Sequence, residues 1–116
     1  MPDTSTRGPK KPHHAEITPS DLAEWVFEGP TPAIIDLRDE SEFKAGHIPG
    51  ALNAPLSRSE DLVSRVPDDG RIVLVCDNGA RSREALRLLE LCGCRRVMYL
   101  QGGQRAWTAA GYPVGA

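Results

Sequence analysis

The sequence is poor in cysteine, and the few cysteines it has are badly placed for a structural framework. Its three cysteines are Cys76, Cys92 and Cys94, a number too small and odd for a network of disulfides. Cys92 and Cys94 are one residue apart and have no histidine near them in sequence, so we expect no metal site. We interpret these two as inert thiols, the alternative being that either forms a disulfide with Cys76, and Cys76 is the cysteine of interest.

Basic charge and long apolar runs are also scarce. The formal net charge is −2, without the basic excess of a nucleic-acid-binding domain, so no nucleic-acid partner is expected. No apolar run approaches the ~20 residues of a membrane-spanning helix, so no membrane partner is expected either. The N-terminus lacks the apolar stretch of a secretory signal, which makes the cytoplasm the expected location.

What remains is the composition of one globular domain. The chain has 116 residues, of which 40% are hydrophobic and 26% charged, ordinary values for a single core. Residues 1–14 hold prolines, a glycine and small polar or basic residues, so we expect a disordered tail there. The domain itself is predicted over residues 15–116.

Two patterns alternate along this domain. Short apolar runs indicate strands or extended segments, and amphipathic stretches indicate helices. The predicted strands cover residues 16–18, 33–37, 51–55, 71–76 and 97–100. The predicted helices cover the stretch from the Thr18 cap to Gly29 and residues 40–45, 60–66, 82–91 and 104–110. Such alternation predicts an α/β fold with a mainly parallel sheet and helices on both faces.

Chemistry is indicated where the strand ending at Cys76 meets the helix beginning near Ser82. Ligands of open α/β sheets collect at the carboxyl ends of strands. Gly79 accepts positive φ without steric cost, so the loop can turn backbone N–H groups inward as an anion-binding nest. The helix N-terminus and Arg81 add positive charge. These features favour a reactive thiolate at Cys76. The alternative is that Cys76 is only a small buried hydrophobic residue at the end of a strand.

Three segments together resemble the rhodanese-like domain family. Residues 76–82, CDNGARS, resemble its C-x-x-G-x-R-S active loop. Residues 35–43, followed by 46–51 and 53–55, resemble its first signature, and residues 100–103 with Trp107 and 111–114 resemble its C-terminal signature. The resemblance spans about residues 15–116. It implies a three-layer α/β fold around a central, mainly parallel sheet of about five strands.

The resemblance also implies an activity, the transfer of sulfane sulfur through a Cys76 persulfide. The donor would be thiosulfate or a persulfide, and the acceptor a thiol, a protein or cyanide, with no cofactor and no metal. We expect a small anionic donor and a monomer or weak dimer. The implied site has two catalytic residues, Cys76 and Arg81, and a substrate-binding set of Asp77, Asn78, Gly79, Ala80, Ser82, Asp36 and Arg38.

Several residues near this site admit two interpretations. The resemblance brings Asp36 toward the active loop, where it would orient Arg81 or a loop N–H; the alternative is an acid in a strand-end turn. Arg38 forms a local ion pair or faces the pocket, and the sequence leaves both open. Asp77 stands where thiosulfate-adapted loops often carry a basic residue, which favours a persulfide donor.

His47 lies in the segment Gly-His-Ile-Pro-Gly-Ala, which favours a structural hydrogen bond within a turn over a general base. Trp25 and Trp107 are predicted to pack rather than to bind substrate.

Two other functions remain possible on this fold. A phosphatase or arsenate reductase would place its arginine six positions after the cysteine, whereas Arg81 is fifth, and would often have a histidine where Val75 stands. A non-catalytic docking module is the second alternative, and the retained Cys76 counts against it.

Overall fold

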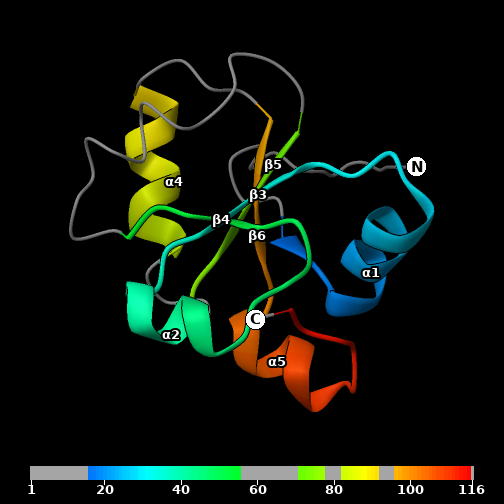
Figure 1. Cartoon of the computed structure of the whole chain (residues 1–116). Coiled ribbons are helices and arrows are strands. Elements are labelled where there is room, and N and C mark those ends of the chain that lie inside the picture. Colours follow the sequence, from blue (N-terminus) through cyan, green and yellow to red (C-terminus); the bar gives the residue numbers. More distant parts are fainter. Residues whose placement is uncertain (1–15, 56–70, 78–81, 92–95, 116) are drawn as a thin grey trace, which may run out of the picture.

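The computed structural model describes residues 16–55, 71–77, 82–91 and 96–115. In this part, one sheet contains β2 (Glu16–Ile17), β3 (Ala33–Asp36), β4 (Leu52–Asn53), β5 (Ile72–Val75) and β6 (Val97–Leu100). The helices are α1 (Pro19–Glu28), α2 (Glu40–Ala45), α4 (Ser82–Leu91) and α5 (Gly103–Ala109) (Figure 1). The tail predicted over 1–14, the helix predicted over 60–66, and Cys92 and Cys94 lie outside the described residues.

The sheet has the order β2-β6-β5-β3-β4. Each of these pairings is parallel, with Asp36 of β3 beside Val75 of β5 and Leu74 of β5 beside Tyr99 of β6. The prediction of an α/β fold with a mainly parallel sheet is therefore confirmed. All residues of β5 are buried, as its unbroken apolar sequence indicates for a strand covered on both faces. Cys76 directly follows the carboxyl end of this central strand.

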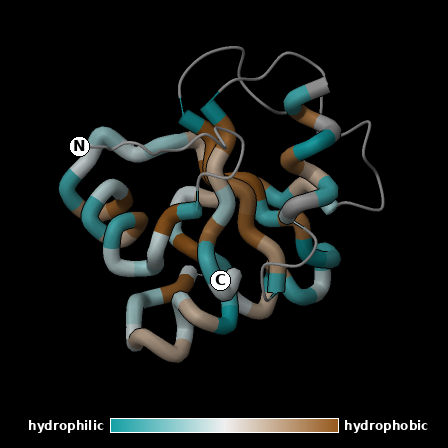
Figure 2. Tube along the Cα trace, turned by 180° about the vertical axis from the view of Figure 1, so that it is seen from behind, coloured by the Kyte–Doolittle hydropathy of each residue, from teal (hydrophilic) through white to brown (hydrophobic). Residues whose placement is uncertain are grey.

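Helices cover both faces of the sheet. α4 contributes Ala85, Leu86 and Leu89 to a core with Ile35, Leu74 and Tyr99. α1 and α5 contribute Leu22 and Trp107 to the opposite core, which contains Ile34, Val73 and Leu100. Neighbouring strand residues thus point to opposite faces, as the pleat requires. Figure 2 shows the hydrophobic positions concentrated in the central strands, with mixed hydropathy in the helices around them.

Local sequence signals explain where the first helices begin. The Thr18 hydroxyl accepts a hydrogen bond of 3.2 Å from the Asp21 N–H, and Pro19 opens α1, a placement in which a missing N–H costs nothing. Asp39 and Glu42 form a reciprocal capping box at the start of α2. Both helices therefore start where the sequence predicts them.

The tryptophans and His47 have structural roles. Trp107 is fully buried and donates from Nε1 to the Pro113 carbonyl at 3.0 Å. Trp25 packs against the same core and has the Arg71 guanidinium 3.9 Å above its ring. His47 Nδ1 bonds the Phe43 carbonyl at 2.8 Å. The prediction of packing tryptophans and a hydrogen-bonded histidine is confirmed.

Candidate active site

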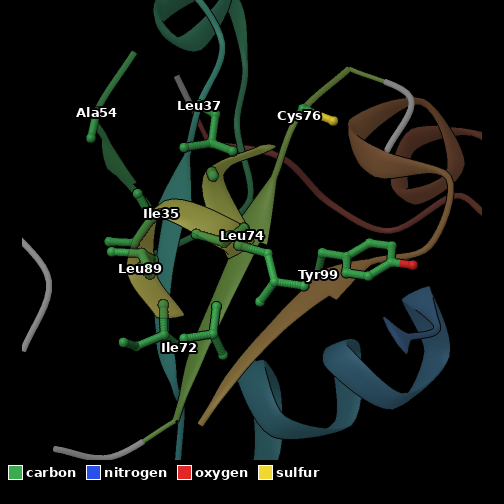
Figure 3. Packing of buried hydrophobic residues seen from close by; sticks show 11 residues of the cluster. Ile35, Leu37, Ala54, Ile72, Leu74, Cys76, Leu89 and Tyr99 are labelled. Carbon is green, nitrogen blue, oxygen red and sulfur yellow. The ribbon is translucent and has the colours of Figure 1, made fainter. Parts of the chain in front are cut away.

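Cys76 lies directly after β5, at the carboxyl end of a strand flanked by β3 and β6 (Figure 3). Its side chain belongs to the core on the α4 side, with Leu37 and Ala85, and only 1% of the residue is exposed. The alternation along the strand sets this side: Val75 faces the α1 and α5 core, so Cys76 faces the other. A thiol at this position is shielded from bulk solvent.

The first residue of α4 contacts the sulfur. Ser82 is fully buried, and its hydroxyl donates a hydrogen bond to Cys76 Sγ over 3.3 Å. Ser82 is the first residue of the ten-residue helix α4, so the positive end of the helix dipole is near the sulfur. A hydroxyl donor and a helix N-terminus both stabilise negative charge on sulfur. Ser82, one of the candidate residues inferred from the sequence, therefore contacts the Cys76 sulfur directly.

The start of α5 holds the backbone of Cys76 and Asp77. The Gln104 N–H donates to the Cys76 carbonyl at 2.7 Å, and the Arg105 N–H donates to the Asp77 carbonyl at 3.0 Å. These bonds satisfy amides at a helix start, where no partner exists within the helix. They also fix the direction in which the chain leaves β5 and enters the predicted active loop.

Gly103 makes this close approach possible. Its φ is +63°, and a Cβ placed there would lie 2.7 Å from the Asp77 carbonyl group and closer still to the Cys76 oxygen. Only glycine combines that conformation with the missing side chain. Sequence reasoning used Gly102 and Gly103 only as part of a signature. A glycine pair directly after a strand was the available signal for a close backbone contact.

Asp77 forms an ion pair with Arg105 at the edge of the site. Arg105 Nε lies 3.1 Å from Asp77 Oδ2, and the side chains are 74% and 46% exposed, respectively. The two residues are far apart in sequence, and Arg105 was not among the predicted site residues. The nearest sequence signal was the position of Arg105 directly after the Gly-Gly-Gln segment, which does not identify a partner.

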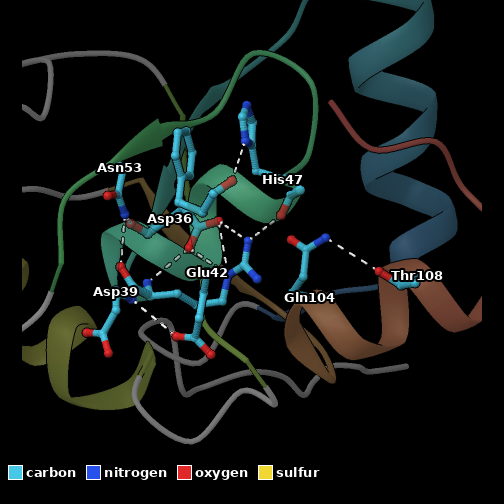
Figure 4. Close-up of polar contacts among 10 residues, drawn as sticks. Asp36, Asp39, Glu42, His47, Asn53, Gln104 and Thr108 are labelled. Atoms are coloured by element: carbon cyan, nitrogen blue, oxygen red, sulfur yellow. Dashed lines mark hydrogen bonds and ion pairs between the residues drawn. The ribbon is translucent and has the colours of Figure 1, made fainter. Parts of the chain in front are cut away.

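Asp36 and Arg38 form a buried ion pair beside the site (Figure 4). Arg38 donates from Nε and Nη2 to the Asp36 carboxylate, with an Nη2–Oδ2 distance of 2.9 Å, and Nη2 also reaches the Gly46 carbonyl at 2.8 Å. Asn53 Nδ2 donates to the backbone carbonyls of both residues. Of the two readings of Arg38, the structure shows the local ion pair. This network joins the end of β3 to α2 and β4.

The remaining candidates are Asn78, Gly79, Ala80 and Arg81, which lie outside the described residues. The expectation that Asp36 orients Arg81 or a loop N–H therefore stays a prediction. Within residues 16–55, 71–77, 82–91 and 96–115, no group of three His, Cys, Asp or Glu residues is arranged to hold a metal ion. The helices of this part are too short or too polar to cross a bilayer.

The sequence is similar to a known domain family and to known proteins. Residues 18–110 match the family model of the rhodanese-like domain. The chain is 34% identical over 99 residues to a sulfurtransferase of Allochromatium vinosum, covering 85% of this chain and 92% of that protein. It is 40% identical over 93 residues to the probable adenylyltransferase/sulfurtransferase MoeZ of Mycobacterium tuberculosis, covering 78% of this chain but only 24% of that protein's length.

The fold is also similar to that of solved structures. The crystal structure of a rhodanese-related protein from Thermoplasma volcanium superposes with a TM-score of 0.78 at 26% identity, covering 88% of this chain and 98% of that one.

Proposed function

The chain belongs to the rhodanese-like domain family, and we propose that it is a sulfurtransferase in which Cys76 carries sulfane sulfur as a persulfide. The observation that carries the proposal is the hydrogen bond from the buried Ser82 hydroxyl to Cys76 Sγ, 3.3 Å long, at the junction of β5 and α4. It gives a cysteine at the carboxyl end of a central strand a donor suited to a thiolate.

The reaction proceeds in two displacements on sulfur. The Cys76 thiolate attacks the outer sulfur of the donor, and the donor's sulfur–sulfur bond breaks. Its electron pair leaves on sulfite or on a thiolate, and Cys76 retains the transferred atom as a persulfide. An acceptor thiolate or cyanide then attacks that terminal sulfur and regenerates the Cys76 thiolate. Atoms and electrons balance without an external oxidant or reductant.

In this proposal, the loop after Cys76 binds the transferred sulfur and the donor. The backbone N–H groups of Asn78, Gly79 and Ala80 bind the transferred sulfur or an anionic donor, and Arg81 supplies a full positive charge. Described residues on both sides of this segment support the proposal. Ser82 donates to the Cys76 sulfur, and two backbone N–H groups of α5 donate to the carbonyls of Cys76 and Asp77.

The donor that we favour is a persulfide rather than thiosulfate. Asp77 places a carboxylate one residue after the nucleophile, 46% exposed, where it repels a small dianion approaching from solvent. Comparable thiosulfate turnover by wild type and Asp77→Ala would remove the basis for this preference. The acceptor is a thiol, on a small molecule or on a protein.

Cyanolysis kinetics test the proposal. Wild type should form thiocyanate from a low-molecular-weight persulfide, and less rapidly from thiosulfate, whereas Cys76→Ser should form none above the uncatalysed rate. Cys92→Ser and Cys94→Ser remove one sulfur each and serve as matched controls that should retain activity. Equal turnover by Cys76→Ser and wild type would contradict the proposal. Hydrolysis of an aryl phosphate by wild type would favour the phosphatase alternative instead.

A further inference from the structure

The edge of the candidate site carries two opposite charges held side by side. Asp77 directly follows the nucleophile, and Arg105 lies on the first turn of α5. The two residues are joined twice, by the Arg105 N–H to the Asp77 carbonyl at 3.0 Å and by Arg105 Nε to Asp77 Oδ2 at 3.1 Å. The backbone contact fixes where both side chains originate, and that of Asp77 begins one residue after Cys76.

Within the part of the chain that the structure describes, this Asp77–Arg105 pair retains unused hydrogen-bonding capacity. Among the described residues, Arg105 uses only Nε of its side chain and Asp77 uses only Oδ2. A guanidinium also has two Nη groups that donate, and a carboxylate has a second oxygen that accepts. The side chains of Arg105 and Asp77 are 74% and 46% exposed, respectively, so a ligand in solvent can reach both members of the pair.

We propose that the Asp77–Arg105 pair is a donor subsite for the zwitterionic head of an α-amino-acid persulfide. The ammonium of the donor binds Asp77 Oδ1, and its carboxylate binds the Nη groups of Arg105. The inference rests on the proposed sulfurtransferase function and adds the chemical class of its donor.

Charge complementarity favours this class over the alternatives. A dianion such as thiosulfate finds a partner in Arg105 and repulsion from Asp77, whereas a zwitterion finds one partner for each of its charges. An exposed ion pair contributes little to stability, so its members can turn toward a ligand at small cost. Because the backbone contact keeps the two groups adjacent, little ordering is required when the donor binds.

The chemical step is balanced within the donor and Cys76. The Cys76 thiolate forms a bond to the outer sulfur of the amino-acid persulfide, R–S–SH, and the R–S bond to that sulfur breaks. The electron pair leaves on the amino-acid thiolate, and the proton stays on the sulfur now carried by Cys76. The amino-acid head remains at the Asp77–Arg105 pair during the transfer.

Three persulfide donors separate the two contacts. Cysteine persulfide carries both charges, cysteamine persulfide lacks the carboxylate, and 3-mercaptopropionate persulfide lacks the ammonium. With cyanide as acceptor, wild type should show a kcat/KM for cysteine persulfide about two- to fivefold above that of either other donor, the size expected for one screened charge contact. Arg105→Gln should abolish the preference over cysteamine persulfide, and Asp77→Asn the preference over 3-mercaptopropionate persulfide.

Ratios between donors within one variant cancel any change in Cys76 reactivity. Arg96→Gln and Glu28→Gln are matched charge controls. Both residues are exposed and belong to the amino ends of the strands, away from the carboxyl end where Cys76 lies, because Arg96 precedes β6 and Glu28 ends the helix that leads into β3. These controls should keep the wild-type ratios.

Three results overturn the inference: wild-type ratios near one, ratios that neither site variant changes, or equal changes in the controls. If all three persulfides are nevertheless consumed through Cys76, the subsite is wrong and the sulfurtransferase function stands. If no donor is consumed through Cys76, both fail.

Discussion

Gly103 is the position at which the start of α5 touches the backbone of the candidate nucleophile, and Gly103→Ala tests that contact. Alanine at φ +63° incurs the left-handed penalty of about 1–2 kcal/mol. Its Cβ also overlaps the carbonyl groups of Cys76 and Asp77, and such overpacking costs typically about 1–3 kcal/mol. Relief of the overlap by moving α5 weakens the two backbone hydrogen bonds, each worth about 1 kcal/mol. We therefore expect the free energy of unfolding to fall by about 4 kcal/mol.

Gly111→Ala is the matched control. Gly111 also has positive φ, at +87°, but a Cβ there meets nothing within 4 Å. This variant should lose only the conformational part, about 1–2 kcal/mol. Urea unfolding followed by tryptophan fluorescence gives both values, and failure of Gly103→Ala alone to fold agrees with the expected order. Equal losses in the two variants would show that α5 does not rest on the Cys76 and Asp77 carbonyls as described.

Two other contacts give predictions of different kinds. Ser82→Ala removes the donor to Cys76 Sγ; because hydrogen bonds to charged groups are worth about 1.5–3 kcal/mol, persulfide formation should slow at least about tenfold in stopped-flow measurements. An unchanged rate would mean that the hydroxyl does not support the thiolate. Arg38→Met leaves the Asp36 carboxylate buried without its cation and should lower the free energy of unfolding by about 3–5 kcal/mol. Lys44→Met, in an exposed pair, should change it by less than about 1 kcal/mol, and similar losses in both would contradict the burial argument.

Most of the fold was predictable because its signals are local. The buried run that becomes β5 has no polar interruption, and the Asp39–Glu42 capping box sets the start of α2, so both elements lie where the sequence places them. Differences at the ends are one or two residues. The final helix begins at Gly103 rather than Gln104 because Gly102 takes the left-handed cap conformation. Cap geometry of this kind depends on the contact that follows it.

The site was predictable only in part. The position of Cys76 between an apolar strand and a helix is a local sequence pattern. Ser82 is only six residues away, so its place at the start of that helix could also be predicted. The Asp77–Arg105 pair and the Gly103 contact join segments from different parts of the chain, and neither residue type nor spacing specifies such a partner. For Arg38 the sequence left two directions open, and the Gly46 carbonyl that receives its Nη2 lies in a turn whose position is set by packing.

The central claim is that one sulfur atom rests on Cys76 between the two half-reactions. Its most direct test is mass spectrometry of the protein after exposure to a persulfide donor, before and after addition of cyanide. We expect the peptide containing Cys76 to gain one sulfur atom, ~32 Da, and to lose it on cyanide treatment with release of thiocyanate. A gain located on another cysteine, or no gain while turnover continues, would contradict the account.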